Sequence, residues 1–356
     1  MNSIRALYLE NLELFRPIVA RELAVHYADA ARAVRDGDGD AAAAEIAAPA
    51  EAAVVDAAPA IVPAPAPVAT LPAGFATTSA GPFVLQTDVA DPAWTAAVAQ
   101  VAMALPAVWS ERYGLPLPEP LAGTLVVYAR EADFQALARA EGEPVDRGIR
   151  GSSRGERVAL AIGGQPREDV TALLVHELAH LLARRAFGRD DLPPWLEEGL
   201  AEELALARQT KDGRLLPGTL RGRVRARALD ASSSRPAFAS RFEVSADGAY
   251  GALSSLLAAQ RRGAMPILSK LLALPAEEFR RYEGRRDRYT ASAFFVRFLL
   301  DGRERRSRAP FHAYLAAVAG GGPADGAALA TALGEPLPLL ERDFAAWLRL
   351  QATVNR

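Results

Sequence analysis

Residues 166–188 read PREDVTALLVHELAHLLARRAFG, and this stretch has the start, the interior and the end of a single helix. Pro166 suits a first turn, two acids follow it at the positive end of the helix dipole, and Gly188 stands where a helix stops. Between these ends, leucine, valine and alanine lie on nearly every side, which is typical of a helix inside a domain. The sequence therefore predicts a buried helix over 166–187.

Two histidines in this helix are spaced for metal binding. His176 and His180 lie four residues apart, so their imidazoles project from one face, one turn from each other. The chain has only four histidines, and Glu177 directly follows the first of this pair. Buried polar groups need partners, because an unpaired one costs about 1–3 kcal/mol. A metal ion would satisfy all three groups; the alternative is a pair of ordinary core histidines.

A second stretch, PPWLEEGLAEEL over residues 193–204, supplies a third donor. Its prolines favour a helix that begins at 191 or 192, with an apolar stripe of leucines at four-residue spacing. Catalytic zinc usually takes three protein ligands, and Glu198 is the candidate for the third. Glu202, one turn later, is expected to accept a hydrogen bond from a ligand histidine. Glu197 and Glu203 are expected to be solvated.

These two stretches together resemble the gluzincin metallopeptidases, and most closely the peptidase-MA-like group, with HELAH followed by PWLEEGLAE. The resemblance spans roughly residues 80–350. It implies one Zn²⁺ per chain, held by His176, His180 and Glu198, and it makes Glu177 the general base. The fold that it implies is α+β and thermolysin-like, with an N-terminal lobe of mixed sheet and helices and an all-helical C-terminal lobe.

The chemistry expected of such a site is hydrolysis of a peptide or protein substrate. Zinc lowers the pKa of a bound water towards about 7, so Glu177 can accept its proton and later return it to the leaving amine. The oxyanion needs a further donor. The stretch 289–299 is similar to the helix that carries a tyrosine donor in this group, which points to Tyr289. Tyr250 and His312 are the rivals.

The short apolar segment over 157–162 reads as a strand bounded by glycines, directly before the histidine helix. In gluzincins the corresponding strand is a sheet edge that pairs with an extended substrate. An equally good interpretation is a plain structural strand, because a sequence does not show which strand lies at an edge.

Composition narrows the classes of function. The net charge of −2 predicts neither nucleic-acid binding nor attraction to an anionic membrane. The chain has no cysteine, which excludes disulfides and thiolate ligands. No run approaches the roughly 18 apolar residues of a membrane span. The chain as written is expected to be cytoplasmic, and the alternative is the cell envelope or periplasm if the start site is misassigned.

The chain divides into four parts. Residues 1–36 form an amphipathic helical segment that either binds a protein partner or folds back, and 37–72 are an alanine- and proline-rich linker. An α/β lobe is expected over 73–207 and a helical lobe over 208–356. The predicted strands are 83–87, 124–128 and 157–162; the other predicted helices are 92–112, 131–141, 253–260, 265–272, 275–282, 290–300, 311–319 and 336–351.

Three hypotheses follow for what the protein does. The leading one is a zinc-dependent peptidase, because two separate motifs agree with one mechanism. A second is a non-catalytic binding or regulatory protein on the same scaffold, whose partner docks on the N-terminal helix. A third is a metal-dependent hydrolase of something other than a peptide, since a fold does not determine a substrate.

Overall fold

The structure, a computed structural model, describes residues 74–142, 150–163, 167–209, 215–216, 253, 256–259, 261–262, 267–281 and 283–354. These residues all belong to one compact unit. The predicted N-terminal helix over 1–36, the predicted linker over 37–72 and Tyr250 lie outside the described residues.

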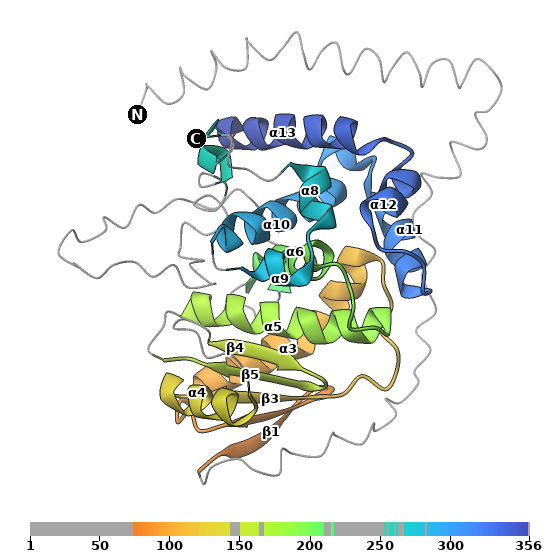
Figure 1. The fold of residues 1–356 in the computed structure, drawn as a ribbon. Helices are drawn as coiled ribbons and strands as arrows, with labels where there is room; N and C mark the ends of the chain where they lie inside the picture. Colours follow the sequence, from red (N-terminus) through yellow and green to blue (C-terminus); the bar gives the residue numbers. More distant parts are fainter. Residues whose placement is uncertain are drawn as a thin grey trace, which may run out of the picture. The chain divides into compact units, whose positions relative to one another are not determined.

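A five-stranded mixed sheet forms the base of this unit, with strand order β1-β2-β3-β5-β4 (Figure 1). The three inner strands are parallel, and each edge strand is antiparallel to its neighbour. A separate pair of two-residue strands, β6 and β7, forms a second sheet. The strands are β1 (Ala76–Ala80), β2 (Phe83–Thr87), β3 (Gly123–Tyr128), β4 (Gly151–Arg154), β5 (Arg157–Ala161), β6 (Arg208–Gln209) and β7 (Leu215–Leu216).

The three predicted strands are confirmed to within one residue, and of the two interpretations of residues 157–162 the plain structural strand is confirmed and the sheet edge is wrong. This segment is β5, and it pairs with β3 on one side and with β4 on the other. The edge strand on this side of the sheet is β4, whose sequence GSSR has no alternation of apolar and polar residues. Sequence analysis used the glycines before residue 157 only as a boundary of the next strand, because glycine and small polar residues are a turn signal.

The sheet buries both of its faces. Successive side chains of a strand point to opposite faces, so alternate residues of β3 and β5 divide between two apolar clusters. One face packs against the long helices α3 (Pro92–Tyr113) and α5 (Arg167–Phe187), and the other packs against α4 (Glu131–Ala140). The residues on the α3 and α5 side include Leu125, Val127, Val158 and Leu160, and those on the α4 side include Val126, Tyr128, Ala159 and Ala161.

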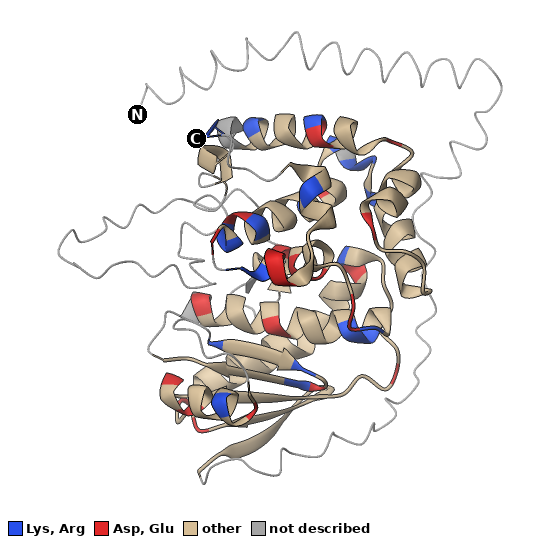
Figure 2. Cartoon of the chain, viewed as in Figure 1, with Lys and Arg blue, Asp and Glu red and all other residues tan. Residues whose placement is uncertain are grey.

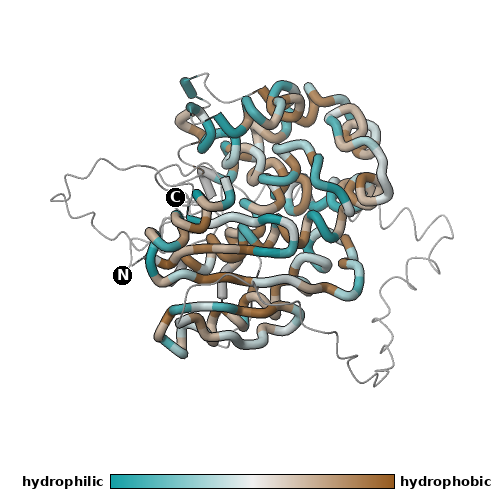
Figure 3. The backbone as a smooth tube through the Cα atoms, turned by 60° about the horizontal axis from the view of Figure 1, so that its bottom comes forward, coloured by the Kyte–Doolittle hydropathy of each residue, from teal (hydrophilic) through white to brown (hydrophobic). Residues whose placement is uncertain are grey.

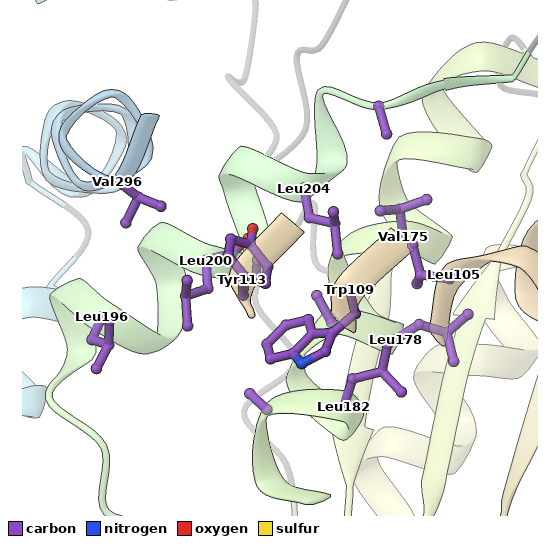
Figure 4. Packing of buried hydrophobic residues seen from close by; sticks show 14 of the residues in the cluster. Leu105, Trp109, Tyr113, Val175, Leu178, Leu182, Leu196, Leu200, Leu204 and Val296 are labelled. Atoms are coloured by element: carbon purple, nitrogen blue, oxygen red, sulfur yellow. The ribbon is translucent and has the colours of Figure 1, made fainter. Parts of the chain in front are cut away.

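Helix α5 lies between the sheet and the helical part of the unit (Figure 1). It spans the predicted range and ends at Gly188, whose φ of 63° is the left-handed conformation that glycine adopts easily. The next helix, α6 (Pro194–Ala205), packs beside it. Figure 4 shows that apolar side chains of α3, α5, α6 and α10 meet in one core, with Trp109, Leu178 and Leu200 among them. This core holds α5 and α6 together.

The remaining described helices follow α6 in the chain, and most of them lie in the upper half of Figure 1. Helix formation is confirmed in each predicted range that the structure describes, whereas α12 was not predicted. Within the predicted range 253–260, only residues 253 and 256–259 are described, as helix. The helices are α8 (Leu268–Ala273), α9 (Ala276–Arg280), α10 (Arg285–Asp301), the short 3-10 helix η1 (Arg303–Arg305), α11 (Arg308–Ala319), α12 (Gly326–Leu333) and α13 (Leu337–Val354).

Hydropathy and charge follow this layering. The hydrophobic colour runs along much of the strands in Figure 3, and charged residues of both signs are interspersed along the helices in Figure 2. Among the described helices, only α3 has the length and hydropathy of a membrane-crossing segment, a test that buried core helices also pass. Leu105, Trp109 and Tyr113 of α3 are fully buried in the shared core, and Arg112 is ion-paired, so we interpret α3 as a core helix.

Candidate metal centre

Helix α5 presents the two histidines of the HELAH motif side by side. The imidazole rings of His176 and His180 have centroids 4.7 Å apart, and their Nε2 atoms are separated by 3.0 Å. His176 is fully buried and His180 is 7% exposed. The four-residue spacing on one helical face explains why both Nε2 atoms reach the same point.

Helix α6 brings a carboxylate to this point. The Oε2 atom of Glu198 lies 3.6 Å from Nε2 of His176 and 3.6 Å from Nε2 of His180, and Glu198 is 1% exposed. Three electron-pair donors from two helices therefore converge in a buried place. The described residues thus contain a His-His-Glu group that is positioned to hold a metal ion.

The electrostatics of the group favour a positive charge between the donors. Burial lowers the pKa of His180, but the carboxylates of Glu198, Glu197 and Glu177 outweigh it and raise this pKa to about 10 in the absence of a metal. A raised histidine pKa means that the surrounding carboxylates stabilise a cation at this position. A proton or a metal ion can supply that cation, and a metal would also be bound by all three donors.

Glu177 lies next to the donors without belonging to them. Its side chain is 3% exposed and lies beside Gly151 of β4. A Cβ added to Gly151 would lie 2.8 Å from both Cγ and Oε1 of Glu177, which is closer than real Cβ contacts allow. Gly151 therefore leaves the space that the Glu177 carboxylate occupies, and the edge strand passes directly beside that carboxylate.

Each histidine has a carboxylate near its other ring nitrogen. Oε1 of Glu202 lies 3.6 Å from Nδ1 of His176, and Oε1 of Glu197 lies 3.3 Å from Nδ1 of His180. The expectation that Glu197 is a solvated residue is wrong, because its side chain is only 18% exposed and contacts both His180 and Arg280. A predicted helical face does not show that a neighbouring helix will cover it.

Tyr289 reaches the centre from α10. Its phenol is 4% exposed and donates a hydrogen bond of 2.7 Å to Oε1 of Glu198, the oxygen that does not face the histidines. The rival His312 lies elsewhere, because its Nε2 is 3.1 Å from the carbonyl oxygen of Arg112, near the end of α3. The role of Tyr289 as oxyanion donor stays a prediction.

Glu203 is also not the solvated residue that sequence analysis expected. It is 2% exposed, and its carboxylate accepts hydrogen bonds from Arg112 and from the phenol of Tyr113. Arg112 also donates to Asp301 in α10. This buried cluster ties α3, α6 and α10 together at one end. No local pattern indicates it, because Arg112 is 91 residues before Glu203.

Gly199 lets α6 and α10 approach closely beside the centre. A Cβ added to it would lie 3.0 Å from Cγ2 of Val296 and 3.1 Å from the carbonyl oxygen of Ser292. These separations are tighter than most real Cβ contacts. The glycine therefore has a packing role in the middle of a helix, where its low helix propensity would otherwise cost about 1 kcal/mol. Glu198, directly before it, is consequently within reach of Tyr289.

Two comparisons with known proteins stand beside this geometry. The chain matches no family model, and a search of curated proteins finds no significant relative.

Proposed function

We propose that this protein is a zinc-dependent metallopeptidase with a two-lobed, thermolysin-like arrangement around the centre on α5 and α6. The observation that carries the proposal is the donor geometry of His176, His180 and Glu198. Zinc bonds of about 2.0–2.2 Å in a tetrahedron place neighbouring ligand atoms about 3.3–3.6 Å apart. The three separations in the protein are 3.0, 3.6 and 3.6 Å. Two imidazoles and one carboxylate are also a donor set of catalytic zinc sites.

When bound, zinc would supply Lewis acidity that polarises a water molecule and a substrate carbonyl. The chain's own contribution to hydrolysis is proton transfer by Glu177. Its carboxylate takes a proton from the attacking water and returns it to the nitrogen of the leaving amine. Burial of Glu177 beside two histidines fits this role, because its carboxylate is within the site and is not one of the three donors.

The edge strand β4 supports a peptide as the substrate. The backbone N–H of Ala161 donates to the carbonyl oxygen of Arg150, and Gly151 is opposite Leu160. Antiparallel pairing alternates along a strand, so Ser152 directs its backbone groups to β5, whereas Gly151 and Ser153 direct theirs to the other side. Among the described strands nothing pairs with that side. An extended peptide that pairs there would run past Glu177.

The test is the substitution Glu177→Gln in the full-length chain. We expect it to keep one zinc per chain and to lose activity on a peptide library by about 100-fold or more, since general acid–base catalysis contributes about 10²–10⁴-fold. The exposed Glu277 on α9 provides the control, and Glu277→Gln should retain full activity. Chelation should abolish hydrolysis and added zinc should restore it. Zinc-loaded protein with no peptide hydrolysis would instead favour the non-catalytic hypothesis.

A further inference from the structure

One carboxylate near the centre has two partners on opposite sides. Oε1 of Glu197 lies 3.3 Å from Nδ1 of His180, whereas Oε2 accepts a hydrogen bond of 3.1 Å from Nη2 of Arg280. The two oxygens therefore serve different partners. The hydrogen bond at Oε2 limits the rotation of the Glu197 carboxylate and keeps Oε1 turned towards Nδ1 of His180, 3.3 Å away.

Arg280 belongs to a different part of the unit from the helix that it contacts. It is the last residue of the five-residue helix α9, and its side chain is 50% exposed. A short connection joins α9 to α10, where Tyr289 contacts Phe279 with ring centroids 5.4 Å apart. Two consecutive glutamates of α6 are therefore contacted by α9 and α10. Arg280 of α9 contacts Glu197, and Tyr289 of α10 contacts Glu198.

For the neutral imidazole of His180, the form that binds a metal, the position of Glu197 decides which ring nitrogen carries the proton. A carboxylate facing Nδ1 favours the tautomer with its proton on Nδ1, because Nδ1–H is the only neutral-imidazole donor that can reach it. The lone pair then belongs to Nε2, which is the atom that faces His176 and Glu198. Ligand histidines generally need such a partner for their tautomer and ring orientation.

We propose that Glu197 is a positioning residue for His180 and that Arg280 is a positioning residue for Glu197. This inference rests on the proposed zinc centre and goes beyond it. Metal affinity at α5 and α6 then depends on an arginine from the helical part of the chain. The exposed Arg280 acts on the metal position through two other residues. It contacts Glu197, and Glu197 contacts His180.

The experiment measures the zinc dissociation constant of the full-length chain by competition with a chromophoric chelator. Glu197→Ala should raise this constant about 10- to 100-fold, the usual effect of removing the partner of a ligand histidine. Arg280→Ala should raise it by about 2- to 5-fold, because a partly exposed ion pair contributes only modestly. The neighbouring Arg281 is exposed and serves as the matched control, so Arg281→Ala should leave the constant unchanged.

The substitution Glu197→Gln separates positioning from a general charge effect. Its amide oxygen can accept from Nδ1–H of His180, but its NH₂ group then faces the guanidinium of Arg280, donor against donor. Removal of Arg280 should therefore weaken zinc binding in the wild type, and should leave it unchanged or strengthen it in the Glu197→Gln variant. If only the charge of Arg280 mattered, its removal would instead strengthen binding of the cation in both backgrounds, which would overturn the proposal.

Cobalt provides a second readout that a purely structural role would not move. The visible spectrum of the Co²⁺-substituted chain should change in Glu197→Ala, because the ring of His180 reorients, and should be unchanged in Arg281→Ala. A wild-type zinc constant and cobalt spectrum in Glu197→Ala would overturn this inference alone. A wild-type chain that binds neither zinc nor cobalt would instead overturn the proposed function.

Discussion

The phenol of Tyr289 donates a hydrogen bond of 2.7 Å to Oε1 of Glu198, while Oε2 of the same carboxylate lies 3.6 Å from both histidines. The phenol therefore occupies one oxygen and directs the other towards the metal position. This contact joins α10 to α6 and gives Tyr289 a role in ligand orientation, whether or not it also contacts a substrate.

Replacement of Tyr289 by phenylalanine tests this relationship. We expect Tyr289→Phe to raise the zinc dissociation constant by about 10-fold, because a ligand loses the group that orients it. The ring keeps its packing against Phe279, so the free energy of unfolding should fall by about 1–3 kcal/mol, the cost of leaving Oε1 of Glu198 without its donor. Chelator competition and urea unfolding measure the two effects.

Tyr314 offers the matched control for that substitution. Its buried phenol donates 2.6 Å to the carbonyl oxygen of Ala324, so Tyr314→Phe also removes one buried hydrogen bond, though to a backbone carbonyl. We expect a similar loss of stability and no change in zinc binding. An unchanged zinc constant in Tyr289→Phe together with a large fall in kcat would contradict ligand orientation and favour the oxyanion role.

Gly151 should be needed for hydrolysis and dispensable for metal binding. A Cβ at this position would lie 2.8 Å from Cγ and Oε1 of Glu177 and 2.8 Å from Cδ1 of Leu173, so Gly151→Ala must displace both side chains. A shift of about 1 Å in a catalytic group can lower the rate by about 100-fold. We expect a fall of that order in kcat/KM on a peptide substrate, with the zinc constant within about twofold of the wild type.

Ser152→Ala, on the same strand, is the control for the edge-strand substitution and should keep near-normal activity. Normal activity in Gly151→Ala would show that the edge strand does not constrain Glu177, and would count against this account of the site.

Gly199→Ala tests the close packing of α6 on α10. The added methyl group would lie 3.0 Å from Val296 and 3.1 Å from the carbonyl of Ser292, so the helices must separate. Overpacking of this kind costs about 1–3 kcal/mol, which denaturant unfolding measures. We also expect weaker zinc binding, because Tyr289 moves with α10. The double substitution Gly199→Ala with Val296→Ala should recover part of the lost stability and part of the lost zinc affinity. Wild-type stability in Gly199→Ala alone would contradict the close packing of these helices.

The buried cluster of Arg112, Glu203 and Asp301 should contribute to stability only while each of its charges keeps an oppositely charged partner. Arg112→Met leaves the buried Glu203 with the phenol of Tyr113 at 3.0 Å and with a more distant cation, Arg297 at 3.7 Å, and should lower the free energy of unfolding by about 3–5 kcal/mol. The double substitution Arg112→Met with Glu203→Leu should lose less than the sum of the single ones. The exposed Arg342 beside Asp343 is the comparison, and Arg342→Ala should cost less than about 1 kcal/mol. Additive losses would contradict this pairing.

Local sequence was sufficient for the elements that carry the donors. The helix over 166–187 and the stripe on α6 depend on periodicity and end signals within about 20 residues, and both helices form. The four-residue spacing brought His176 and His180 together in prediction, and Glu198 was assigned to them as the third ligand that catalytic zinc usually takes. The resemblance added the role of Glu177, which no contact in the protein tests.

What sequence analysis missed depends on contacts between distant segments. β4 has no alternation of apolar and polar residues, since two of its four residues are serine. Its Gly151 leaves space for the side chain of Glu177, a contact that a sequence pattern does not show. Glu203 is buried because Arg112 meets it from α3, and Arg112 is itself paired with Asp301 of α10. A rule that expects lone carboxylates to be exposed cannot anticipate partners that only the tertiary fold provides.

Zinc stoichiometry of the full-length chain, measured by elemental analysis after dialysis, tests the central claim most directly. We predict one zinc per chain in the wild type and in Glu177→Gln, and loss of the metal in His176→Ala and in Glu198→Ala, because each removes one of the three converging donors. A wild-type chain that binds no zinc, or zinc retained at full stoichiometry in both His176→Ala and Glu198→Ala, would contradict the account.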